Sequence, residues 1–245
     1  MPTENSRMPM DKVYPSLASA VADIPDGATI MIGGFTSIGG HPGHLILALR
    51  DQGARELTII SNGMGLGAGA SKVNRPVGVA DVAALVENGQ VRKGIASFPV
   101  SPSPSNPSPF EKLLTEGKVE VEALPQGTMT ERMRIAAAGL GGFYTRVGVG
   151  TVVEEGKEKR VFDGREYILE KPLRADYALV HAYKADRMGN LVYKGTSRNF
   201  NPIMAAAARV TIVEAEEILE IGALDPEEIM TPGVYVDRIV QVPRG

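Results

Sequence analysis

The chain has 245 residues, three histidines, no cysteine and a formal net charge of −3. It is long enough to bury a large core without disulfides, and the absence of a basic block argues against a nucleic-acid partner. No apolar run approaches the roughly 20 residues of a membrane helix, and residues 1–10 are polar. We therefore expect a cytoplasmic protein with a disordered segment 1–10 and a single domain over residues 11–245.

The first half of the chain alternates between short apolar runs and helix-length segments. Predicted strands cover Thr29–Gly34, Leu57–Ser61, Gly94–Phe98 and Val119–Leu124. Predicted helices cover Pro42–Gln52, Val79–Asn88, Phe110–Glu116 and Thr128–Ala138. Strands separated by helices indicate a parallel sheet with right-handed crossovers. The pattern predicts an α/β fold, with a mostly parallel open sheet and flanking helices.

Two segments interrupt this alternation. Ser101–Pro109 carries four prolines in nine residues, which predicts a surface loop within the domain. After the glycine-rich segment Gly139–Gly150, the residues Arg160–Glu170 predict a hairpin that turns at Asp163-Gly164. A second set of predicted strands follows, at Tyr177–Tyr183, Leu191–Tyr193, Val210–Val213 and Val234–Val240.

A glycine-rich loop follows the first predicted strand, and Pro42 then begins a helical pattern. Such a loop allows backbone N–H groups to approach a negatively charged or polarised oxygen closely. A tight turn without a binding role is the alternative interpretation. The candidate binding residues in this segment are Gly33, Gly34, Phe35, Gly39 and Gly40.

Five ordered motifs together resemble the alpha (A) subunit of the family I coenzyme A transferases, over residues 11–242. They are Asp26–Pro42, Leu124–Thr128, Gly141–Thr151, Ala185–Leu191 and Ser197–Asn201. The sequence departs from the family pattern in a loop one residue longer before Pro42, and in Arg146 where proline is usual. The resemblance implies the open α/β sheet of that superfamily, which is shared with sugar-phosphate isomerases and deaminases.

The same resemblance implies one half of an active site. Family members move CoA from an acyl-CoA donor, such as succinyl-CoA, to a carboxylic acid, here a 3-oxo acid. A glutamyl-CoA thioester forms on a beta subunit that carries a Ser-Glu-Asn-Gly motif, and this motif is missing here. We expect a heterotetramer or larger assembly, no metal and no bound cofactor, with the CoA thioester as substrate. An interface is expected on the strands after Ala175 and on Gly139–Gly150.

Gln126 allows two interpretations. A glutamine after Pro125 can cap the following helix near Thr128, which the sequence alone favours. In the family that the chain resembles, the matching glutamine helps to form an oxyanion hole, where an amide donor stabilises the negative charge of each acyl-transfer step.

Asn62 also has two interpretations. It follows a predicted strand within Ser61-Asn62-Gly63, which reads as an Asn-Gly turn or as a polar contact to the acyl substrate. The resemblance implies the substrate contact, although Gly63 stands where the family often has a second asparagine.

Two further patterns are weak. Gly63–Ala68 satisfies a dinucleotide-binding glycine motif, but Gly69, Asn74 and Pro76 interrupt the helix that should follow. Glu87 precedes Asn88-Gly89, yet it is expected at the end of a helix rather than in a pocket, so we interpret it as structural.

A metal site is not expected. His41 and His44 lie near one another, but two histidines without a third ligand make a poor zinc site. Two alternative functions remain. A sugar-phosphate isomerase would need a cationic phosphate cluster beside a carboxylate base, and no such loop is evident. The other alternative is a non-catalytic regulatory subunit.

Overall fold

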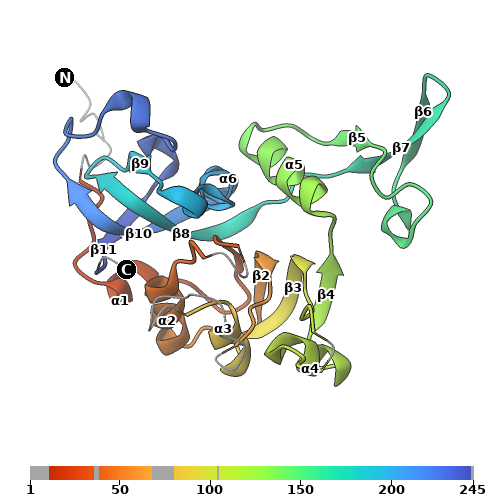
Figure 1. Cartoon of the computed structure of the whole chain (residues 1–245), viewed down its shortest axis with the longest axis horizontal. Helices are drawn as coiled ribbons and strands as arrows, with labels where there is room; N and C mark the ends of the chain where they lie inside the picture. The colour runs from red at the N-terminus through yellow and green to blue at the C-terminus, as the bar shows by residue number, and fades with distance from the viewer. Residues whose placement is uncertain (1–10, 36–38, 68–79, 104, 244–245) are drawn as a thin grey trace, which may run out of the picture.

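The computed structural model describes residues 11–35, 39–67, 80–103 and 105–243. The predicted disordered segment 1–10 and the predicted helix start at Val79 lie outside these residues. The largest sheet has eight strands. Figure 1 shows helices on both sides of it.

The large sheet is mostly parallel, as predicted. Its strands are β1 (Thr29–Ile32), β2 (Leu57–Gly63), β3 (Val91–Phe98), β4 (Glu120–Ala123), β8 (Ala175–Asp186), β9 (Leu191–Val192), β10 (Ala208–Leu219) and β11 (Arg238–Gln241). The order is β11-β10-β8-β1-β2-β3-β4, with parallel neighbours throughout, and β9 pairs antiparallel with β8. The carboxyl ends of β1, β2, β3 and β4 therefore meet along one edge, where α/β proteins commonly bind ligands.

Helices cover the two faces of this sheet unequally. One face carries α1 (Leu17–Val21), α2 (Gly43–Gln52), α3 (Ala83–Glu87) and α4 (Pro109–Thr115). The other carries α5 (Gln126–Ala137) and α6 (Asn201–Ala207). Figure 1 shows the two groups on opposite sides of the strands. Short 3₁₀ helices occur at η2 (Val152–Glu154), η3 (Gly195–Arg198), η4 (Pro226–Glu228) and η5 (Gly233–Tyr235).

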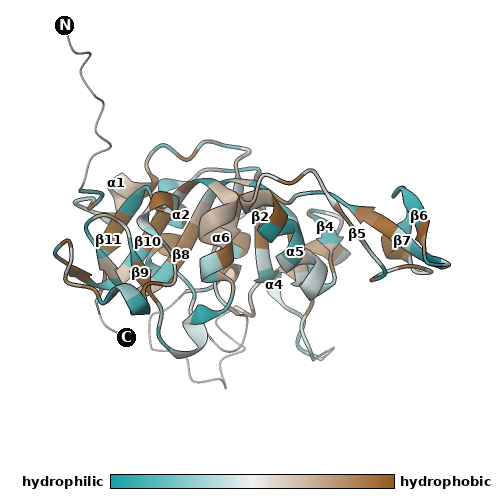
Figure 2. Ribbon diagram, turned by 90° about the horizontal axis from the view of Figure 1, so that it is seen from above, coloured by the Kyte–Doolittle hydropathy of each residue, from teal (hydrophilic) through white to brown (hydrophobic). Residues whose placement is uncertain are grey.

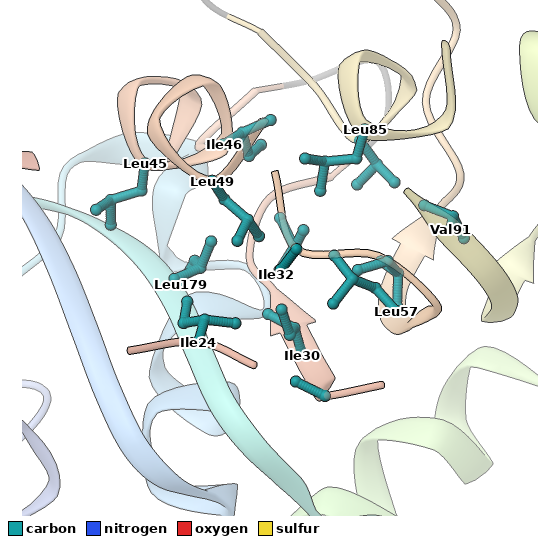
Figure 3. Close-up of a cluster of buried hydrophobic side chains, with 14 of the residues drawn as sticks. Ile24, Ile30, Ile32, Leu45, Ile46, Leu49, Leu57, Leu85, Val91 and Leu179 are labelled. Atoms are coloured by element: carbon teal, nitrogen blue, oxygen red, sulfur yellow. The ribbon is translucent and has the colours of Figure 1, made fainter. Parts of the chain in front are cut away.

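Side-chain alternation along the strands separates two hydrophobic cores. Ile30 and Ile32 of β1 pack against α1, α2 and α3, with Leu45 and Leu49 of α2 above them (Figure 3). Met31 points to the opposite face and packs in the second core, beneath α5 and α6. Because β1 is buried on both faces, its apolar residues form a continuous run rather than an alternating one.

A separate three-stranded sheet extends away from the large one (Figures 1 and 2). It comprises β5 (Phe143–Thr145), β6 (Lys159–Phe162) and β7 (Arg165–Glu170), in the order β5-β7-β6. The predicted hairpin is confirmed, with the positive φ of 48° at Asp163 and 70° at Gly164 that a tight hairpin turn requires.

Some predicted elements differ from the structure. The first half of the predicted strand Val234–Val240 is wrong, because Gly233–Tyr235 forms η5 and β11 begins only at Arg238. Helices α1 and α6 were not predicted. The single-domain organisation of residues 11–245 stays a prediction.

The expected interface on the strands after Ala175 is corrected for β8 and β10, and stays a prediction for Val234 and Tyr235, which are exposed. Strands β8 and β10 lie inside the large sheet, with neighbours on both edges and a hydrophobic core on each face. Most of their apolar side chains pack in these two cores and are not available to a partner. Exposed apolar side chains occur instead in the three-stranded sheet and in the connections that follow β8 and β10.

Candidate functional site

The glycine-rich loop leaves β1 and returns on itself. The Gly33 amide donates to the Leu179 carbonyl at 3.0 Å, which extends the pairing of β1 with β8 by one residue. Phe35 and Gly39 then exchange two backbone hydrogen bonds of 3.0 and 3.1 Å. Gly39 and Gly40 have φ values of 104° and 74°, which favour glycine, and they turn the chain into α2.

Asn201 lies fully buried beneath this loop and links both of its ends. Its Nδ2 donates to the Gly40 carbonyl at 2.9 Å and to the Ser197 carbonyl at 3.0 Å. Its Oδ1 accepts the His181 amide at 3.0 Å. A Cβ atom at Gly33 would lie 1.8 Å from Asn201 Oδ1, so the close approach of Asn201 to the backbone requires glycine there.

His41 closes the loop from the other side. This buried histidine faces the Gly33 carbonyl through Nδ1 at 3.2 Å. A Cβ at Gly34 would come within 2.3 Å of the same Nδ1 atom. The two glycines after β1 are therefore explained by the packing of Asn201 and His41 against the backbone.

Gln126 is the first residue of α5, two residues before the predicted start of this helix. Pro125 occupies the N-cap position, and no side chain caps the helix. The capping interpretation of Gln126 is therefore wrong. Among the residues that the structure describes, no hydrogen bond is made by the Gln126 side-chain amide, and the residue is half-buried. Its amide donor is available to a ligand.

Phe35 and Gln126 line one open pocket of about 510 Å³, which we term the Phe35–Gln126 pocket. Its other lining residues are Thr130, Arg198, Asn199, Phe200, Pro202, Ile203 and Met230. The rings of Phe35 and Phe200 stack with their centroids 6.3 Å apart, which gives the pocket an apolar wall. Arg198 is the one charged residue among these described lining residues.

A second open groove of about 620 Å³ lies beside the first turn of α5. Its lining residues are Gln126, Gly127, Thr128, Thr130, Glu131, Phe143, Thr145 and Val147. Gln126 and Thr130 belong to both cavities.

Asn62 lies within β2, so the alternative of an Asn-Gly turn is wrong. Alternation places Asn62 on the same face of the sheet as Ile60, beneath α5 and α6. It is fully buried and is not among the lining residues of the two cavities beside Gln126. Its contact with substrate stays a prediction.

Arg198, Asn199 and Phe200 were not predicted as site residues. Their segment was recognised as a motif, but nothing in the sequence shows that it folds back to the glycine-rich loop. The Asn199 Nδ2 atom donates to the Gly39 carbonyl at 3.2 Å, which joins the two segments across 160 residues of chain.

The two weak motifs lie elsewhere. Glu87 is the exposed last residue of α3, as expected for a structural residue. After β2, the segment Met64–Gly67 is irregular rather than helical, and Asp81 accepts the backbone amides of Leu66 and Ala83 at 3.0 Å each. Ala68, the last residue of the glycine motif, lies outside the described residues.

Comparisons with known proteins agree with this architecture. The chain is 48% identical over 233 residues to the A subunit of a 3-oxoadipate CoA-transferase from Pseudomonas putida, covering 95% of this chain and 94% of that protein. It is 44% identical over 231 residues to the A subunit of a succinyl-CoA:3-ketoacid coenzyme A transferase from Xanthomonas campestris pv. campestris, strain B100, covering 94% and 88%.

A solved structure is also similar. The acyl-CoA transferase of Escherichia coli O157:H7, in a thioester complex with CoA, has a TM-score of 0.78 and 25% identity. The match covers 95% of this chain and 47% of that one, so the present chain spans about half the length of that transferase.

Within the described ranges, no helix is both long and apolar enough to cross a membrane. The family model for coenzyme A transferase matches residues 14–242, nearly the whole chain. The resemblance inferred from the motifs is thus confirmed, with the transferase class of activity that it implied: the chain belongs to the coenzyme A transferase family.

Proposed function

We propose that this chain is the alpha (A) subunit of a heteromeric CoA transferase that moves CoA from an acyl-CoA, such as succinyl-CoA, to a 3-oxo acid. One observation carries the proposal. The Phe35–Gln126 pocket offers a free amide donor beside an apolar wall, yet its lining within the described chain contains no carboxylate. Glu131 lines the second groove beside Gln126, but it is ion-paired with Arg134, so we assign the nucleophile that the reaction needs to a partner subunit.

The chemistry requires a donor in the position of Gln126. A partner glutamate attacks the thioester carbonyl and expels CoA as the thiolate, which leaves an acyl-glutamyl anhydride. The thiolate then attacks the glutamyl carbonyl and releases the donor acid, and the acceptor acid takes CoA by the reverse sequence. Each attack places negative charge on a carbonyl oxygen, which a preorganised amide donor stabilises.

The guanidinium of Arg198 in the pocket favours an acid substrate with two carboxylates. A fixed cation at the reacting carboxylate would stabilise the ground state as much as the transition state, and so would not accelerate transfer. We assign the guanidinium to a second carboxylate at the far end of the acyl chain, as in a succinyl group or a dicarboxylic 3-oxo acid. The stacked Phe35 and Phe200 rings would contact the methylene groups between the two ends.

The partner subunit is proposed to cover apolar residues near this pocket. Met230 lines the pocket and is 45% exposed, and Val234 and Tyr235 follow it at 74% and 41%. Relatives that are named as A subunits support the need for a second kind of chain. We propose that this partner carries a Ser-Glu-Asn-Gly motif, that the assembly is a heterotetramer or larger, and that CoA enters as substrate without a resident cofactor. The cytoplasmic location stays a prediction.

The sugar-phosphate isomerase alternative fits this site poorly. Such an enzyme needs several cations for a phosphate and a carboxylate base beside them, whereas the described lining of the Phe35–Gln126 pocket has one arginine and no carboxylate. A CoA-transfer assay of the complex distinguishes the proposal from the alternative of a regulatory subunit.

The test is CoA transfer by the purified chain alone and by the chain co-expressed with its candidate partner, over a panel of acids. We expect no activity alone and activity in the complex, unchanged by Glu87→Gln in this chain. Transfer by the single chain would contradict the division of the site between two subunits. An inactive complex would favour a regulatory role.

A further inference from the structure

A buried carboxylate lies on the face of the sheet opposite the Phe35–Gln126 pocket. Glu214 of β10 is almost fully buried, and its Oε2 accepts the backbone amide of Leu45 at 2.9 Å. Its Oε1 lies 3.1 Å from His181 Nδ1 and 3.6 Å from His44 Nδ1. Three elements, α2, β8 and β10, therefore meet at one carboxylate.

This contact gives α2 the cap that its own sequence lacks. Pro42 occupies the N-cap position and makes no side-chain hydrogen bond, and no acidic residue lies in the first turn. Backbone N–H groups in the first turn of a helix have no partner within the helix, and the positive end of the helix dipole favours a negative charge there. Glu214 supplies both a hydrogen-bond acceptor and a negative charge, from a position 169 residues away from Leu45 in sequence.

Two histidines balance the charge of Glu214. Burial opposes ionisation of Glu214, but the interactions with His181 and His44 outweigh it and lower the pKa of this carboxyl. Burial likewise opposes protonation of His181, yet Glu214 and Glu216 raise its pKa. The interaction with Glu214 raises the pKa of His44. The charged groups in contact at this point are His44 from α2, His181 from β8, and Glu214 and Glu216 from β10.

The same cluster is bonded to the glycine-rich loop. The carbonyl of His41, the residue before Pro42, accepts the Gly43 amide at 2.9 Å as the loop enters α2. The backbone amide of His181 is held by Asn201, whose Nδ2 atom in turn holds the Gly40 carbonyl. A displacement of α2 would therefore reach Gly40 through the backbone of His41, and a displacement of His181 would reach it through Asn201.

We propose that Glu214 is a positioning residue, which fixes the start of α2 and thereby holds residues 33–35 and 39–41 in place behind the Phe35–Gln126 pocket. Its consequence for turnover rests on the proposed function, but its effect on the loop does not. Glu214 is not the nucleophile of the reaction, because it is buried on the opposite face of the sheet from Gln126.

The direct test is amide hydrogen exchange in the full chain, purified with its partner subunit, for wild type, Glu214→Gln and Glu216→Gln. Glu214→Gln leaves an acceptor for the Leu45 amide but removes the negative charge, and hydrogen bonds to charged groups are about twice as strong as neutral ones, so exchange at Gly39–Leu45 should accelerate about tenfold. Exchange in β3 should keep its rate. Glu216→Gln is the matched control, because Glu216 contacts His181 but not α2, and it should change exchange at Gly39–Leu45 less than about twofold.

Unchanged exchange at Gly39–Leu45 in a folded Glu214→Gln protein would overturn the proposal. If the amides of β3 also exchange fast, the Glu214→Gln variant has lost its fold. The His44→Gln variant then tests the positioning role of Glu214 instead. His44 is one-third exposed, and its replacement removes only the outer contact to Glu214. We expect accelerated exchange at Gly39–Leu45 alone in that variant, and unchanged exchange there would overturn the proposal.

The pH dependence separates positioning by charge from simple packing. Because the pKa values of both histidines are raised, their stabilising effect is complete below about pH 6.5 and is lost as the pH rises through the higher folded-state values. Protection of Gly39–Leu45, corrected for intrinsic exchange rates, should fall over this range in wild type. In Glu214→Gln, where Glu216 still contacts His181, it should fall less than in wild type, and an identical profile in both proteins would contradict the role of the charge.

Activity supplies an independent readout. Displacement of Phe35 should raise KM for the acid in Glu214→Gln more than it lowers kcat, and leave KM for the acyl-CoA near wild type. If the complex lacks transferase activity altogether, the proposed function fails while the exchange result still decides the role of Glu214.

Discussion

The two faces of the large sheet use their polar side chains in opposite ways. On the face covered by α1 to α4, the Glu214 carboxylate is surrounded by a backbone amide and two imidazoles. On the face of α5 and α6, the Gln126 amide makes no hydrogen bond within the described chain, and Arg198 makes one long bond of 3.4 Å to the Tyr193 carbonyl. Polar side chains whose hydrogen-bonding atoms are all paired fix the geometry of the fold, whereas those with unpaired donors in an open pocket are available to a ligand.

The largest expected effect comes from removing the amide of Gln126, on the face of the sheet that carries α5 and α6. Gln126→Ala should lower kcat of the complex by about 10²–10³, because one oxyanion donor is worth that much. KM should change less, because the donor bonds most strongly to charge that is present only near the transition state. Steady-state kinetics on the purified complex measure both.

Gln126→Glu should be slower still, because a carboxylate would face the developing negative charge. The unfolding midpoint of Gln126→Ala should stay near that of wild type, since this side chain caps no helix. A destabilised but fully active alanine variant would return Gln126 to a structural role.

The next effect breaks the packing behind the glycine-rich loop. Gly33→Ala would place a Cβ atom 1.8 Å from Asn201 Oδ1, which is far inside van der Waals contact. We expect a loss of up to about 3 kcal/mol in the free energy of unfolding, as for overpacking of a tight site. Urea denaturation measures it, and wild-type stability would show that Asn201 does not hold this loop.

A smaller effect tests the charge in the pocket. Arg198→Gln should raise KM about tenfold for a dicarboxylic acid, since an exposed charged hydrogen bond contributes about 1.5 kcal/mol. A monocarboxylic 3-oxo acid should keep its KM, and Arg198→Lys should fall between the two proteins. Equal effects on both acids would contradict a role in recognising the second carboxylate.

The smallest expected effect tests a glycine that, unlike Gly33, has free space around it. Gly127 lies in the first turn of α5, and a Cβ there would meet nothing within 4 Å. Gly127→Ala should stabilise the chain by about 0.5–1 kcal/mol, because alanine loses less backbone entropy in a helix. A rise in the urea midpoint checks it, and a fall would mean that this backbone needs glycine.

Local patterns predicted most of the fold and part of the site. The strand and helix alternation up to α5 was recognisable because parallel strands are buried on both faces and their connections have helical length. The glycine-rich loop and Gln126 both lie at the carboxyl edge of the parallel strands, after β1 and β4, as expected for an α/β protein.

Features that depend on distant contacts were not predictable. Helix α1 has only five residues, too few for a clear amphipathic pattern. The first half of a predicted strand is η5, where Gly233 packs closely against Met188 and Asn190. Glu214 follows the predicted strand Val210–Val213 and is one of several acidic residues in the sequence there. Its pairing with His44 and His181 depends on the register of β8 with β10, which no local pattern specifies.

The division of the active site between two chains can be measured directly by intact-mass analysis of the separated subunits after the complex reacts with an acyl-CoA. We expect one of them to gain the mass of CoA less water, as a glutamyl thioester, and that one to be the partner. The present chain should keep its unmodified mass, in wild type and in Glu87→Gln alike. A CoA adduct on this chain would contradict the account.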